Sequence, residues 1–148
     1  MLRNAVQATF VGHVIEAGVE NESDTQKILA IAFSSDDTLM ATVSIDGPLR
    51  IWDVATGKPT VTHEVNSPRI DDVMFLPDSK VVVIPSSDEQ YSGSVWLVDA
   101  ATGKRVKPLK GHVDNVMSVR FLPKQKQVVT ASMDGAIKFW DVDPATLK

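Results

Sequence analysis

Short apolar runs separated by polar turns repeat along most of the chain. Each run is five to seven residues long and rich in β-branched side chains, which is typical of β-strands and too short for helices. Turn-forming residues stand between the runs, as at 35–37 and 56–58. The pattern predicts an all-β protein, with strands at residues 28–33, 39–44, 49–53, 70–75, 80–86, 94–99, 116–121, 127–132 and 136–142.

The runs belong to a repeat. Phe33, Phe75 and Phe121 lie 42 and then 46 residues apart, and a serine follows each of them after eleven positions. A period near this length, with turn residues in register, favours a β-propeller. A two-layer sandwich is the alternative fold, but a sandwich has no reason to repeat its turns in register.

The third repeat carries the clearest motifs: Gly111-His112, then Ser132-Met133-Asp134-Gly135, then Phe139-Trp140-Asp141. On these motifs the chain resembles the WD40 family. The resemblance implies about three four-stranded antiparallel blades of a propeller that is incomplete or is completed by oligomerisation. It also implies a buried structural network in which the aspartate accepts hydrogen bonds, the serine bridges, and the indole N–H finds a partner. The network residues would be His112, Ser132, Asp134 and Trp140, with Ser44, Asp46 and Trp52 in the first repeat.

The second repeat departs from this pattern, because Val98 stands where the first repeat has Trp52. The expected organisation is a single domain over 1–148, with an outer strand at 6–11 and repeats at 12–66, 67–110 and 111–148. Three blades are few for a ring. We therefore expect either further blades in a longer chain or a homo-oligomer that completes the propeller.

The composition of the chain narrows the range of functions that we expect. The net charge of -4 argues against a phosphate-binding surface, so we expect no direct nucleic-acid partner. The chain has no cysteine, its three histidines are widely separated, and it has no phosphate-binding glycine loop, so we expect no metal and no cofactor. An apolar run long enough for a signal peptide or a membrane span is also missing. We therefore expect a cytoplasmic or nuclear protein that does not contact membranes.

The residue types of a hydrolase triad are present in His112, Ser132 and Asp134. The repeat argues for a structural role instead, because Ser44 and Asp46 reproduce the same pair in the first repeat. The Gly-x-Ser-x-Gly motif of hydrolases is also missing from the sequence. We expect no catalytic residues.

Two insertions point to a binding surface. They occupy 14–27 and 88–92, in loops that leave the same face of a WD40 propeller, and they make that face acidic. We expect a non-catalytic scaffold that binds a protein or peptide through this face; a ligand-sensing propeller is the alternative and a hydrolase a remote one. For Trp96 the competing interpretation is packing between blades. The candidate partner-binding residues are Tyr91, Ile45, Met133, Asp88, Glu89, Glu20, Glu22 and Trp96.

Overall fold

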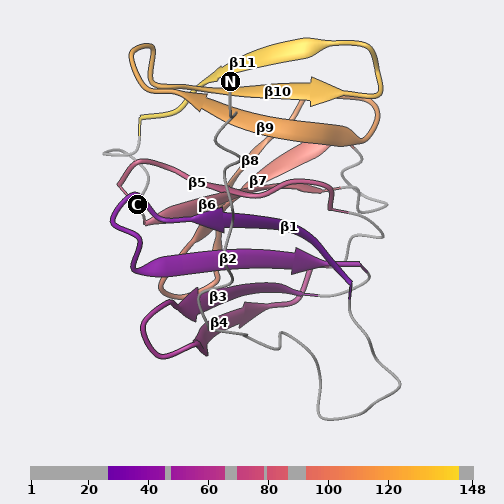
Figure 1. Cartoon of the computed structure of the whole chain (residues 1–148). Coiled ribbons are helices and arrows are strands. Elements are labelled where there is room, and N and C mark those ends of the chain that lie inside the picture. Colours follow the sequence, from indigo (N-terminus) through magenta and orange to yellow (C-terminus); the bar gives the residue numbers. More distant parts are fainter. Residues whose placement is uncertain (1–26, 46–47, 66–69, 79, 87–92, 144–148) are drawn as a thin grey trace, which may run out of the picture.

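The computed structural model describes residues 27–45, 48–65, 70–78, 80–86 and 93–143. These residues form eleven strands in three antiparallel sheets, stacked in chain order (Figure 1). The fold is all-β, and no helix of the described residues is long and apolar enough to cross a membrane. The expected outer strand at 6–11 lies outside the described residues.

Each sheet corresponds to one repeat. The first, in the order β1-β2-β3-β4, contains β1 (Ile28–Phe33), β2 (Leu39–Ser44), β3 (Leu49–Asp53) and β4 (Lys58–His63). The second, in the order β5-β6-β7-β8, contains β5 (Met74–Phe75), β6 (Val81–Ser86), β7 (Ser94–Asp99) and β8 (Arg105–Leu109). The third, in the order β11-β10-β9, contains β9 (Val116–Leu122), β10 (Gln127–Ser132) and β11 (Ile137–Asp141).

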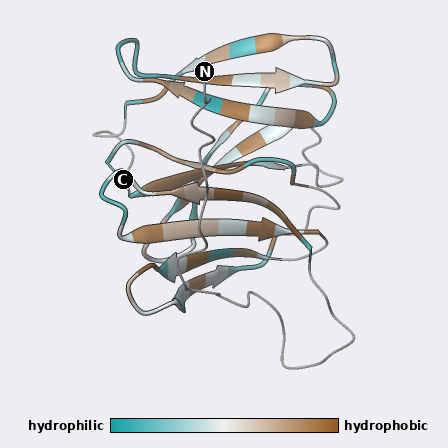
Figure 2. Cartoon of the chain, viewed as in Figure 1, coloured by the Kyte–Doolittle hydropathy of each residue, from teal (hydrophilic) through white to brown (hydrophobic). Residues whose placement is uncertain are grey.

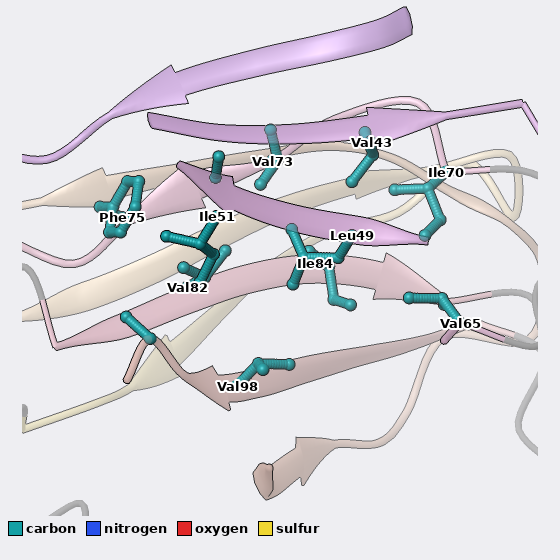
Figure 3. Close-up of a cluster of buried hydrophobic side chains, with 12 residues drawn as sticks. Val43, Leu49, Ile51, Val65, Ile70, Val73, Phe75, Val82, Ile84 and Val98 are labelled. Atoms are coloured by element: carbon teal, nitrogen blue, oxygen red, sulfur yellow. The ribbon is translucent and has the colours of Figure 1, made fainter. Parts of the chain in front are cut away.

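The second sheet is the centre of the molecule because it packs on both faces. Ile84 and Val98 point into the cluster shared with the first sheet, whereas Val83 and Leu97 point into the cluster shared with the third, and all four are fully buried. Figure 3 shows the first of these clusters, with side chains from the first sheet meeting those from the second. This two-sided burial explains why β6 and β7 are continuous apolar runs rather than alternating ones.

The strand β5 is shorter than the sequence predicts. The expected strand at 70–75 pairs with β6 only at Met74 and Phe75. The carboxylate of Asp72 instead accepts hydrogen bonds from the Ser118 hydroxyl (3.1 Å) and the Val119 amide (3.0 Å) of β9. This part of the chain therefore joins the second sheet to the third rather than extending the β5–β6 ladder.

Candidate functional site

A chain of buried hydrogen bonds runs through the third repeat. His112 contacts Asp134 through Nδ1 (2.8 Å to Oδ2) and Thr130 through Nε2 (2.7 Å to Oγ1). The indole N–H of Trp140 donates to the same Thr130 hydroxyl at 2.9 Å. His112 and Thr130 are buried, so each of these polar groups depends on its partner inside the protein. The network fixes the turn at His112 to the turn at Asp134.

The bridging residue is Thr130, which corrects our expectation that Ser132 would bridge. The Ser132 hydroxyl donates to the carbonyl of Asp114 (2.9 Å) and accepts from the amide of Asp134 (3.1 Å). The register between β9 and β10 shifts at Ser132, at the end of the strand, and its side chain therefore serves the turn. Both ring nitrogens of His112 are already engaged, by Asp134 and Thr130, so the three residues do not form the serine–histidine pair of a hydrolase.

The first repeat keeps part of this network, whereas the second does not. In the first, the indole N–H of Trp52 donates to the Thr42 hydroxyl at 2.9 Å. The buried Ser44 hydroxyl has no hydrogen-bond partner among the described residues, and Asp46, its expected neighbour in the network, lies outside them. In the second repeat Ile84 and Val98 occupy the threonine and tryptophan positions, and both are fully buried. An apolar pair therefore replaces the polar one there.

The carboxylate of Asp134 is the charged group at the centre of the hydrogen bonds of the third repeat. Burial raises the pKa of its carboxyl, but hydrogen bonds from the Ala136 amide, the His112 ring and the Val113 amide outweigh that effect and hold the pKa well below its usual value. The carboxylate therefore stays ionised near neutral pH and ties the turn at His112 and Val113 to its own turn at 134–136. This bonding makes the surrounding turns rigid.

The turns held by this network lie on one side of the molecule. We call this side the loop face: it is the side where the chain enters β1, β5 and β9 and leaves β2, β6 and β10. The Met133 amide donates to the Asn115 carbonyl, and the equivalent Ile45 amide donates to the Lys27 carbonyl, both at 2.9 Å. In both repeats the two loops therefore lie side by side. The expectation that the insertions share one face depends on this arrangement.

Three apolar side chains stand exposed on the loop face. Ile45 is 41%, Met133 63% and Val113 82% exposed, each next to a backbone position fixed by a hydrogen bond. Ile45 and Met133 were candidates from the sequence, whereas Val113 was not. Its signal was present in the sequence, since it is the apolar residue directly after Gly111-His112.

The loop face continues from the third repeat to the second at Gly93. This glycine has a φ of +76°, and a Cβ atom added to it would lie 2.4 Å from the carbonyl oxygen of His112 and 2.8 Å from that of Asp114. Only a residue without a side chain fits this close approach of two backbones. Gly93, directly before β7, thus lies against the turn that leads into β9.

The remaining candidates fall into two groups. Trp96 lies in the middle of β7, packs against the cluster between the first and second sheets, and carries the Arg105 guanidinium over its ring at 4.4 Å. The contacts of Trp96 are therefore those of packing between blades. The other candidates lie outside the described residues: Tyr91, Asp88, Glu89, Glu20 and Glu22.

The face opposite the loop face is hollowed between neighbouring sheets. One hollow of about 480 Å³ lies between the second and third sheets and includes Phe121, Pro123, Lys80 and Lys126 in its wall. Its volume is in the range of small-molecule sites, and its wall combines apolar side chains with charged ones.

Stacked antiparallel sheets, one for each sequence repeat, and a Trp–Thr–His–Asp chain of hydrogen bonds define a repeat protein of the propeller class. The sequence matches the WD40 family, described as WD domain, G-beta repeat, over residues 5–53 and 103–141. The chain belongs to the WD40 family.

Solved structures agree on the fold. The C-terminal WD40 domain of Sif2 superposes with a TM-score of 0.66 at 22% sequence identity, over 76% of this chain and 31% of that one. Among curated proteins, the guanine nucleotide-exchange factors SEC12 of Mus musculus and Rattus norvegicus are each 30% identical over 69 residues. That alignment spans 47% of this chain and only 16% of each relative.

Proposed function

We propose that this protein is a non-catalytic scaffold that holds a protein or peptide partner on its loop face. The observation that carries the proposal is the exposure of Ile45, Val113 and Met133 on turns whose backbone is already fixed by hydrogen bonds. Exposed apolar side chains on turns whose backbone is already hydrogen-bonded are suited to contact a protein partner.

The rigidity of the support favours binding. A partner that docks on Val113 and Met133 would not have to order the turns beneath them, because the network of His112 and Asp134 orders them beforehand. Loops that become ordered on binding reduce affinity, and preorganised ones avoid that cost. The hydrogen-bond network thus supports binding indirectly, because it orders the turns that carry the contact residues.

Charge indicates the chemistry of the partner. The segments 14–27 and 88–92, which we expect to be insertions on this face, contain the acidic residues Glu20, Glu22, Asp88 and Glu89, and the chain has a net charge of -4. A partner segment with basic residues around an apolar anchor would match this balance. Tyr91, the single tyrosine of the chain, would supply an aromatic contact in the same region.

Selection from a random peptide display library tests the proposal without a known partner. Peptides enriched on the protein should combine Lys or Arg with apolar residues, and Met133→Asp and Val113→Asp should each reduce their affinity at least about tenfold, as loss of an apolar contact does. Val54→Asp is the matched control, because Val54 is also exposed (37%) but follows β3 on the opposite face. Equal losses for all three variants would contradict the proposal.

Ligand sensing is a second candidate, favoured by the hollow of about 480 Å³ beside Phe121 and Lys126. In this case Lys126→Glu should change the affinity for a small molecule and leave peptide capture on the loop face unchanged. Isothermal titration with a panel of sugars and small acids separates the two candidates.

The names of the curated relatives raise guanine nucleotide exchange as a third candidate, although the alignment spans only 16% of each relative. Release of a fluorescent nucleotide from a small GTPase would measure it directly. Unchanged release at saturating concentrations of this chain would exclude exchange by these residues alone.

A further inference from the structure

His63 is the last residue of β4, and it lies where the first sheet meets the second. Gly103, in the segment 100–104 between β7 and β8, is packed closely against β4. A Cβ atom added to Gly103 would lie 2.8 Å from Cγ1 of Val61 and 3.5 Å from Cβ of His63. We call this packing of Val61 and His63 against the segment 100–104 the outer contact.

The outer contact differs in character from the apolar cluster between the same two sheets. In Figure 2, β4 is more hydrophilic than β2, an internal strand of the same sheet. Val61 packs against the apolar cluster, whereas His63 brings a titratable ring into the contact. The strength of the outer contact can therefore depend on the charge of one side chain.

The imidazole of His63 has a polar atom that the fold leaves unsatisfied. Its Nε2 atom is buried and has no hydrogen-bond partner among the described residues. Leu49, opposite on β3, and Gly103 offer no side-chain acceptor. A neutral imidazole can leave Nε2 without a proton, whereas a protonated ring carries an N–H on both nitrogens. Protonation would therefore create a buried donor without an acceptor, together with a positive charge that water no longer solvates fully.

Two charged groups act on this ring, Arg105 of β8 and Glu64 directly after β4. The guanidinium of Arg105 lies over the ring of Trp96, 4.4 Å from its centre, and its positive charge disfavours a second cation nearby. Glu64 has the opposite effect. Burial of the ring in the first place, and the charge of Arg105 in the second, outweigh Glu64 and hold the pKa of His63 below its usual value of 6.5.

His112 shows the contrast within the same chain. Its two ring nitrogens contact Asp134 and Thr130, and one of these partners is a carboxylate that can accept from a protonated ring. His63 has no such acceptor at its buried nitrogen among the described residues. The neutral form of His63 is therefore the form that fits the folded chain.

We propose that His63 makes the outer contact sensitive to acid: protonation of its ring separates β4 from the segment 100–104 and loosens the first sheet from the second, while the third sheet keeps its packing. The contribution of His63 is complete above the pKa of a histidine in an unfolded chain, about 6.5. It is lost as the pH falls from there toward the lower pKa of the folded chain. Within this window each pH unit makes the open contact up to about tenfold more favourable.

An NMR titration of the histidine Cε1–H signals in the unmodified chain tests the first step, with His63→Gln used to assign the His63 signal. We expect His63 to titrate with a pKa below 6.5. Arg105→Met should raise this pKa because it removes a nearby positive charge, and Glu64→Gln should lower it. A pKa of His63 at or above 6.5 in the unmodified chain, or shifts of the same sign in both variants, overturns the proposal.

Hydrogen exchange with mass spectrometry tests the opening itself, at about pH 7.5 and about pH 5.5 after correction for the intrinsic exchange rates. We expect β4 and the segment 100–104 to lose protection at the lower pH, and β9 and β10 to keep it. His63→Gln should abolish this difference, because its side chain is neutral at both values. Thr62→Gln is the matched control: it changes the exposed neighbour on the same strand and should keep the acid response.

The other results contradict the proposal. An acid response that persists in His63→Gln assigns the loss of protection to another group. A loss centred on β9 and β10 would point to His112, which is bound to Thr130 of β10. Equal loss in all three sheets would mean that acid unfolds the chain as a whole. The titration of the unmodified chain gives its answer even if a variant does not fold.

Discussion

At the scale of single residues, Thr130 is the residue that links the hydrogen bonds of the third repeat. Its hydroxyl contacts both the indole N–H of Trp140 and Nε2 of His112, and it is fully buried. In the neutral imidazole Nδ1 carries the proton, because the ionised carboxylate of Asp134 can only accept. Thr130 then donates to His112 while it accepts from Trp140, so one hydroxyl satisfies two buried groups.

Replacement of Thr130 by Val keeps the shape of the side chain and removes both hydrogen bonds. We expect Thr130→Val to lower the free energy of unfolding by about 1–3 kcal/mol, because His112 and Trp140 are left without their partner. Urea denaturation followed by fluorescence measures the change. Thr42→Val is the matched control and should cost less, since Thr42 holds only Trp52. An equal or larger loss for Thr42→Val would contradict this account of the bridge.

The sequence identified His112, Asp134 and Trp140 but assigned the bridge to Ser132. The serine was conspicuous because it recurs eleven positions after each phenylalanine. The threonine contact is diagonal: Trp140 lies opposite Val128, and its indole reaches Thr130 two residues along β10. Such a contact becomes visible only when the register of the strands is known.

At the scale of elements, the sequence predicted the existence of the strands more closely than it predicted the residues at which they begin and end. β2 and β3 have the predicted bounds, because apolar runs bounded by turn residues define both. β5 is shorter than predicted because Asp72 is bound to β9, a contact between residues 46 or more apart in the chain. Local patterns do not contain such contacts. The side chains proposed from the insertions lie outside the described residues.

Gly93 connects two elements of the loop face and can be tested as a junction. Gly93→Ala should destabilise the fold by more than about 1–2 kcal/mol, because it adds a collision with the His112 carbonyl to the cost of a positive φ. Gly135→Ala is the control, since Gly135 has a similar φ of +81° but no atom within 4 Å of an added Cβ. The difference between the two variants in thermal unfolding isolates the collision. Equal shifts would show that the backbones can move apart.

At the scale of the whole molecule, the order of the sheets follows from the repeat, because each repeat builds one sheet that packs on the next. The sequence predicted this arrangement from the spacing of Phe33, Phe75 and Phe121. It did not predict which faces would remain exposed. Phe139 occupies the same position in its repeat as the fully buried Leu97, and the two differ only in whether another sheet follows within the described residues.

This asymmetry predicts unequal stability along the stack, which hydrogen exchange with mass spectrometry can measure. Amides of β6 and β7 should exchange most slowly, because both strands are paired on both edges and buried on both faces. Amides of β1 and β11 should exchange faster in dilute solution, since among the described residues each lies at the edge of its sheet and carries large exposed apolar side chains.

Hydrogen exchange measured at several protein concentrations distinguishes the stability of the single chain from stabilisation by association. If copies of the chain associate through the exposed Ile137 and Phe139 of β11, a higher protein concentration should slow exchange in β11 and leave β6 and β7 nearly unchanged. The variant Phe139→Asp should lose this dependence in β11. Slower exchange in all eleven strands at once would instead mean that association stabilises the chain globally, which would place the cooperative unit at the level of the assembly rather than of the individual sheet.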